Sequence, residues 1–127
     1  MNTDTLFFFS EHMSALPLYE RLEELILEQI PDVNIKVSKT QISFSNKRGF
    51  VFVSFNPCRK TKECPRVWIT VTFGLGYRKD SPRIDVVTEP YPGRWTHHVM
   101  VGCEKEIDNE LMGWLREAAE FSPNLRK

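Results

Sequence analysis

The hydrophobic pattern of this chain changes its period near residue 31, and this change restricts the fold more than any other feature. From Pro17 to Ile30, apolar residues recur at helical spacing and glutamates occupy the opposite face. From Val33 onward, apolar and polar residues alternate one by one, which is typical of a strand with one buried face. An amphipathic helix followed by half-buried strands predicts a sheet covered by helices on one side.

The rest of the chain adds strands and two further helices. We expect a short helix at Thr3 to Met13 and a last helix from about Glu104 onward. Strands are predicted at residues 33–37, 41–45, 50–55, 68–73, 84–89 and 98–101. Because most links between them are short, the strands should form an antiparallel meander. The predicted fold class is α+β: a five- or six-stranded antiparallel sheet with the N-terminal and C-terminal helices packed on one face, in a single domain spanning residues 1–127.

The formal net charge of zero hides a strong asymmetry along the chain. Residues 1–32 carry seven acids and one base, residues 33–79 ten bases and one acid, and residues 80–127 nine acids and six bases. The three regions therefore have net charges of −6, +9 and −3. If the helices and strands lie where predicted, the molecule is negative on its helices and positive across its sheet, so neutrality does not exclude an anionic partner.

Several classes of protein are disfavoured by what the chain lacks. Cys58, Cys64 and Cys103 are an odd number in a chain that needs no disulfides, and we interpret them as reduced thiols of a cytoplasmic protein. No apolar run approaches the roughly 18 residues of a membrane helix. The cysteine and histidine spacing matches no zinc motif, and Gly74 and Gly76 lack the third glycine of a dinucleotide fingerprint. The sequence therefore predicts no metal, no cofactor and no membrane contact.

The first candidate site is the segment from Arg94 to His98, which follows a turn rich in proline and glycine and is predicted to be a loop. Arg94 offers a planar cation, Trp95 an aromatic platform, and His97 and His98 groups that titrate near neutrality. The alternative is a tryptophan that anchors the entrance of a strand, with two surface histidines. On a regular strand the two histidines would point to opposite faces and could not bind one ligand together.

The second candidate site is the sheet face that the helices leave open. Alternation places Lys36 opposite the core positions of its strand, and it does the same for Gln41 and Ser43. Lys39 and Thr40 lie in the bend between these strands. Either Phe50 and Phe52 or Val51 and Val53 must share the open face, and Trp68, Thr70 and Thr72 are further candidates. Such a face could bind a ligand, form a dimer interface or simply be solvated.

Three segments resemble a known family: Leu16 to Tyr19, Lys36 to Phe44, and Thr88 to His98. They are similar to an uncharacterised bacterial family of small stand-alone proteins, catalogued as a domain of unknown function. Related domains occur in longer chains, some of them labelled predicted transport proteins. The resemblance extends over nearly the whole chain and implies a cytosolic α+β domain. It implies no activity, substrate or catalytic residue.

The leading hypothesis is a non-enzymatic binding module for an anionic small ligand or an acidic partner. Its predicted binding residues come from both candidate sites: Lys36, Lys39, Thr40, Gln41, Ser43, Trp68, Arg94, Trp95, His97 and His98. The alternatives are single-stranded nucleic-acid binding, a homodimer in which the sheet face is only an interface, and an enzyme that uses His97 or His98 with a nearby acid.

Overall fold

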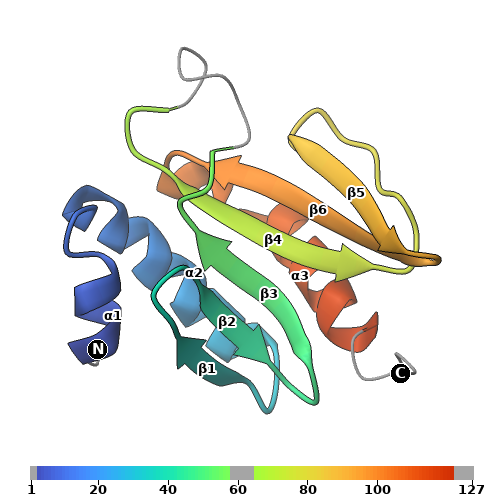
Figure 1. The fold of residues 1–127 in the computed structure, drawn as a ribbon, viewed down its shortest axis with the longest axis horizontal. Coiled ribbons are helices and arrows are strands. Elements are labelled where there is room, and N and C mark those ends of the chain that lie inside the picture. Colours follow the sequence, from blue (N-terminus) through green and yellow to red (C-terminus); the bar gives the residue numbers. More distant parts are fainter. Residues whose placement is uncertain (1–2, 58–64, 122–127) are drawn as a thin grey trace.

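The computed structural model describes residues 3–57 and 65–121. These residues form three α-helices, six strands and two short 3-10 turns (Figure 1). The helices are α1 (Thr3–Phe8), α2 (Leu16–Gln29) and α3 (Asn109–Phe121). The strands are β1 (Asn34–Val37), β2 (Ile42–Ser45), β3 (Gly49–Ser54), β4 (Ile69–Leu75), β5 (Val86–Tyr91) and β6 (Arg94–Val101). The 3-10 turns are Met13–Ala15 and Glu104–Glu106.

The six strands form one antiparallel sheet in the order β1-β2-β3-β4-β6-β5, which confirms the predicted α+β class. The expectation of a simple meander holds only for the first four strands. After β4, the connection at residues 76–85 leads to β5, which does not pair with β4 but forms the edge of the sheet. A tight turn at Gly93, where φ is +76°, then folds β6 back between β5 and β4.

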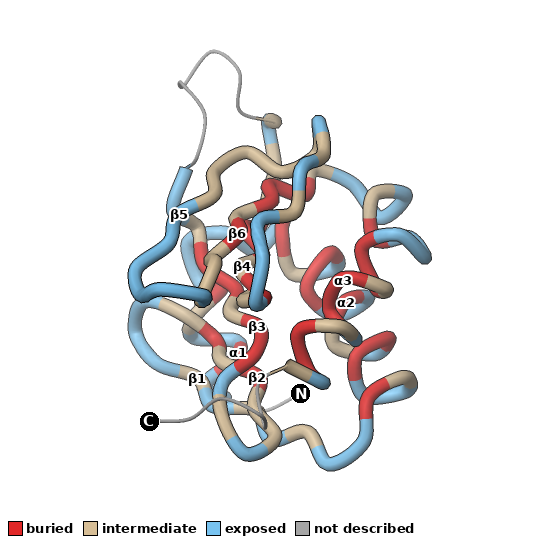
Figure 2. Tube along the Cα trace, turned by 90° about the vertical axis from the view of Figure 1, so that its right-hand side faces the viewer, coloured by how far each residue is buried: buried red, intermediate tan, exposed pale blue. Residues whose placement is uncertain are grey.

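The core lies between one face of the sheet and helices α2 and α3 (Figure 2). Leu22 and Ile26 of α2 and Leu111 and Leu115 of α3 are fully buried there. The sheet contributes its alternate residues, among them Val71 of β4. The other face of the sheet has no helix over it (Figure 1), and we call it the open face. Among the described residues, no helix is long and apolar enough to cross a membrane.

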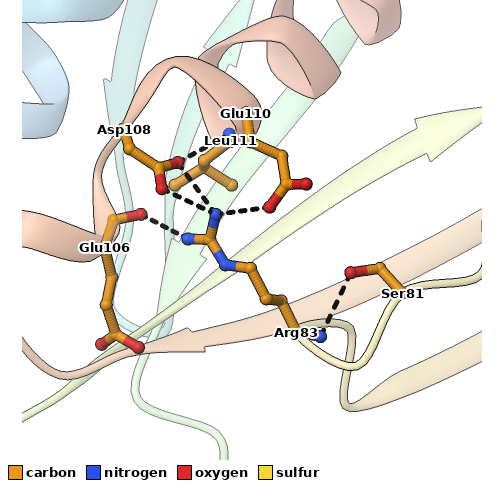
Figure 3. Close-up of polar contacts among 6 residues, drawn as sticks. All are labelled: Ser81, Arg83, Glu106, Asp108, Glu110 and Leu111. Atoms are coloured by element: carbon orange, nitrogen blue, oxygen red, sulfur yellow. Dashed lines mark hydrogen bonds and ion pairs between the residues drawn. The ribbon is translucent and has the colours of Figure 1, made fainter.

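The connection from β4 to β5 is held against the start of α3 by Arg83 (Figure 3). Its guanidinium donates to both carboxylate oxygens of Asp108, at 2.8 and 3.0 Å, to Glu110 at 2.9 Å, and to the backbone carbonyl of Glu106. Asp108 in turn accepts a hydrogen bond from the backbone N–H of Leu111 at 3.0 Å, which caps the helix. One arginine therefore joins the sheet crossover to the helix that covers the sheet.

Two predicted helix boundaries were wrong. The first helix ends at Phe8 rather than Met13, because the backbone continues in tight turns, in which the N–H of Ser10 bonds to Phe7 and the N–H of His12 to Phe9. The last helix begins at Asn109, where Asp108 caps it, and residues 104–106 form a separate 3-10 turn.

Candidate functional site

A single row of side chains crosses the open face from one edge of the sheet to the other. The strand register pairs Lys36 with Ser43, Ser43 with Phe52, Phe52 with Thr72, and Thr72 with His98. The row ends at Val86 on the edge strand. Directly paired residues on one face of a sheet are close neighbours. The fold therefore brings three of the predicted binding residues, Lys36, Ser43 and His98, into one line around Phe52.

A β-bulge decides which aromatic side chain reaches the open face. The pairing of β2 with β3 shifts between Phe44 and Ser45, so Phe50 and Val51 are both buried while Phe52 points outward. The ring of Phe52 lies over Gly49, where a Cβ atom would come within 2.6 Å of its Cζ. The glycine thus provides the space in which this ring lies. The sequence pattern left open whether Phe50 and Phe52 or Val51 and Val53 share the open face. Neither pair does, because Phe52 points to that face while the other three residues are buried.

The centre of the open face is a shallow hollow of about 190 Å³, lined by Gln41, Phe52, Ser54, Asn56, Thr72 and His98. Apart from the aromatic ring, its lining consists of two amides, two hydroxyl groups and an imidazole. Thr70 is fully buried beside it and donates to the backbone carbonyl of Asn56 at 2.7 Å. We call this the open-face hollow. Its side chains are suited to hydrogen bonding and ring stacking rather than to holding a formal charge.

His98 is the one titratable group in the open-face hollow. Its Nδ1 lies 2.8 Å from the hydroxyl oxygen of Thr72, so a ligand in the hollow would meet the other ring nitrogen. Partial burial lowers the pKa of His98 below its usual value of 6.5. The imidazole is therefore neutral near pH 7.

His97 lies on the opposite side of the sheet and takes no part in the open face. Its ring is fully buried and stacks on Phe73, with ring centroids 5.1 Å apart. The backbone N–H of Lys79 donates to its Nε2 at 2.9 Å. Burial lowers the pKa of His97, and the nearby Lys79 and His98 lower it further. This histidine is a core residue that binds the β4–β5 connection.

The prediction of an Arg94–His98 loop was therefore wrong, because these residues are the first five of β6. Trp95 pairs with Leu75 of β4 on the side of His97. Arg94 pairs with Tyr91 at the far end of the hairpin, with its guanidinium 5.7 Å from the tyrosine ring centre. The regular strand sends its side chains to alternate faces, so Arg94, Trp95, His97 and His98 form no common site.

Three other predicted residues line hollows next to the open face. Lys39 and Thr40 belong to a larger groove of about 750 Å³ beside α1, which meets the open-face hollow at Asn56. Trp68 precedes β4 and lines a third hollow with His12 and Arg66. Trp68 is thus separated from Thr72, with which sequence alternation had grouped it.

The positive charge of residues 33–79 is not spread across the open face. Lys79 turns to the helix side, where its ammonium group lies 3.1 Å from Glu117 of α3. Arg78 pairs with Asp80 at 3.0 Å. Among the described bases of this region, Lys36 is the one in the open-face row, and Arg59, Lys60 and Lys62 lie outside the described residues. The expectation of a basic sheet face is reduced to one lysine on the face and others at its margins.

The polar contacts of the two histidines bear on the enzyme hypothesis. Within the described chain, His98 bonds to a threonine and His97 to a backbone amide, and neither bonds to a carboxylate. No group of three or more metal-ligating side chains occurs among the described residues. Cys103 is an exposed free thiol, and Cys58 and Cys64 lie outside the described residues.

The fold and the open face describe an α+β protein with a polar, partly aromatic sheet surface. The chain belongs to the family described as Domain of unknown function (DUF5655), whose model matches residues 7–122. No curated protein and no solved structure matches the chain.

Sequence reasoning missed Ser54 and Asn56 as lining residues and left Phe52 undecided. Ser54 shares the alternation of Phe52, so the strand pattern would have identified it once the bulge was known. Asn56 follows the strand and reaches the hollow because Thr70 binds its carbonyl. No feature of the local sequence predicts that contact.

The histidines predict a stability that depends on pH. Because burial lowers the pKa of both His97 and His98 below the unfolded value of 6.5, the unfolded chain binds protons that the folded protein does not. The stability that the two histidines contribute is fully present above pH 6.5 and is lost as the pH falls below it. Urea unfolding at a series of pH values should therefore show a free energy of unfolding that declines on acidification from about pH 7.

Two histidines contribute to this decline. His97→Phe should flatten it in part, because His98 continues to contribute. Equal stability of the wild type above and below the ordinary histidine pKa would contradict the assignment.

Proposed function

We propose that the protein is a binding module that holds a small anionic ligand with a ring system across the open face. The observation that carries this proposal is the row in which Lys36, Ser43, Phe52, Thr72 and His98 lie side by side. It offers a cation at one end, an aromatic ring in the middle and a neutral imidazole beyond it. The helices leave this face uncovered (Figure 1).

The spacing along the row supports a ligand with its charge and its ring at different ends. Lys36 and Phe52 are two strands apart, which is about 10 Å at the usual spacing of strands. The ammonium group of Lys36 forms no ion pair with a described residue. The open-face hollow of about 190 Å³ then receives the ring, with Phe52 as a stacking surface and Gln41 and His98 as hydrogen-bonding partners.

Isothermal titration with a panel of nucleotides and acidic metabolites tests the proposal. For any ligand found, Lys36→Glu should weaken binding by about tenfold or more, since it replaces attraction by repulsion. Phe52→Ala should have a similar effect by removing the stacking surface. Lys47→Glu is the matched control, because this exposed lysine lies on the β2–β3 turn outside the row. If a ligand binds and neither row variant weakens it, the site is elsewhere.

Single-stranded nucleic acid is the second candidate, and the half-buried ring of Phe52 on the mostly polar open face favours it. Here a base would stack on Phe52 and the cations at the sheet margins, such as Lys39, would contact phosphates. Fluorescence anisotropy with labelled single strands decides this, because phosphate contacts must strengthen as the salt concentration falls. Absence of binding at low salt rules this candidate out.

The remaining expectations are proposals with narrower support. An acidic partner protein could use the same row through Lys36. We also propose that residues 1–127 form one domain, supported by the single sheet that all described strands join, and that the protein is cytoplasmic, supported by the free thiol of Cys103. The homodimer hypothesis placed the interface on the open face. That hypothesis stays a prediction, and Phe52 is the aromatic ring that lines the hollow of that face.

A further inference from the structure

Exposed apolar side chains are concentrated at the first helix and the turn that follows it. The described part of the chain exposes six large apolar side chains, and three of them lie within residues 6–13. Leu6 is 45% exposed, Phe7 76% and Met13 52%. The other three, Leu27, Tyr77 and Tyr91, belong to α2, the β4–β5 connection and β5. Gathered apolar side chains of this kind mark interaction surfaces more often than scattered ones do.

A groove lies beside one of these side chains, Phe7. It has a volume of about 750 Å³ and is bounded by α1, the turn after it and the Ser38–Thr40 bend. Phe55 forms an aromatic floor, on which Phe8 stacks at 5.2 Å and His12 at 4.0 Å between ring centres. Phe7 lines the same groove while most of its side chain projects outward. A projecting ring and a hollow that could receive a ring are thus neighbours on one surface.

The charged groups around the groove are of both signs and are unpaired within the described chain. Asp4 and Glu11 line it from α1 and the following turn, and Lys39 lines it from the β1–β2 bend. None of the three forms an ion pair with a described residue. In a contact between two identical surfaces related by a two-fold axis, each surface must complement itself in shape and in charge. This groove meets the requirement, because it carries a projecting ring beside a hollow, and two acids beside a lysine.

We propose that this surface, formed by Leu6, Phe7, Met13 and the groove that Phe7 lines, is the contact between two copies of the chain. Phe7 of each copy enters the groove of the other. Lys39 of each copy faces Asp4 and Glu11 of the other. This α1 surface goes beyond the proposed function, and its groove meets the open-face hollow at Asn56 without including Phe52 or His98.

Sedimentation velocity of the full chain over a range of micromolar concentrations tests the contact. The wild type should shift from the mass of one chain to that of two as its concentration rises. Phe7→Glu should weaken the association by about tenfold or more, because it removes a central aromatic anchor and buries a charge. The matched control is Leu27→Glu on α2, a comparably placed apolar side chain that is 49% exposed and lies outside the α1 surface. It should leave the association unchanged.

Charge exchange tests the pairing across the two-fold axis. Lys39→Glu should weaken the association, and combining it with Glu11→Lys should restore much of it. A wild type that stays monomeric at the highest concentration overturns the proposal, as does a loss of association caused equally by Leu27→Glu. Thermal unfolding of each variant shows whether it is folded. Ligand titration of Phe7→Glu separates this proposal from the proposed function, since binding on the open face should survive.

Discussion

A His97→Ala variant should lose about 3 kcal/mol of unfolding free energy, the largest effect expected from any substitution at a predicted site residue. The ring is fully buried and stacks on Phe73, so its removal leaves a cavity beside Phe73. The backbone N–H of Lys79, which is only partly buried, also loses its acceptor, and this adds a smaller penalty. Urea unfolding above the ordinary histidine pKa measures the loss.

The conservative variant separates packing from hydrogen bonding. His97→Phe keeps an aromatic ring against Phe73, so it should cost no more than about 1 kcal/mol. It removes the buried Nδ1, which has no hydrogen-bond partner among the described residues, but it also leaves the Lys79 amide without an acceptor. A loss below about 1 kcal/mol for His97→Ala would show that the core does not depend on this ring.

An Arg83→Met variant should lose about 2 kcal/mol, because it removes the charged hydrogen bonds that join the β4–β5 connection to α3. The side chain of Arg83 is 24% exposed, so solvent screens these contacts only in part. Its guanidinium carbon also lies 5.6 Å from the ring centre of Trp114, and methionine retains some of that packing. Figure 3 shows Arg83 with Glu106, Asp108 and Glu110.

Arg78→Met is the matched control for this experiment. Arg78 lies in the same connection, but its single ion pair with Asp80 is largely exposed, so the loss should stay below about 0.5 kcal/mol. A second readout is the carboxyl of Asp108. Partial burial raises its pKa, but hydrogen bonding and attraction to Arg83 outweigh this and lower the pKa below its usual value. In Arg83→Met that pKa should rise, which NMR titration would detect. Equal losses in the two arginine variants would contradict the role given to Arg83.

The order of helices and strands could be predicted because its signals are local. The stripe of Leu22 and Ile26 on α2 and the alternation around Ile42 and Phe44 are properties of short windows, and both were confirmed. The exact ends of the helices were harder to predict. Asp108 caps α3 through contacts that include Arg83 from another part of the chain.

The candidate site was predictable in part for the same reason. Alternation correctly placed Lys36 and Ser43 on the face opposite the core residues of their strands. It also anticipated that His97 and His98 would separate if their segment were a regular strand. The sequence did not indicate that residues 94–98 form a strand. The preceding Pro92 and Gly93 favour a turn, and nothing local shows that β4 pairs with β6 along its whole length.

By itself, the sequence determined the fold class, the helix-covered face and the period-two pattern that divides each strand into core and open-face residues. Only the tertiary structure decided that β6 lies between β4 and β5, that a bulge turns Phe50 inward and leaves Phe52 on the open face, and that Lys79 turns to the helix side. The reason is that periodicity is encoded in neighbouring residues, whereas strand order, register and charge placement depend on contacts between distant ones. Arg83 with Asp108 and Lys79 with His97 are two such contacts.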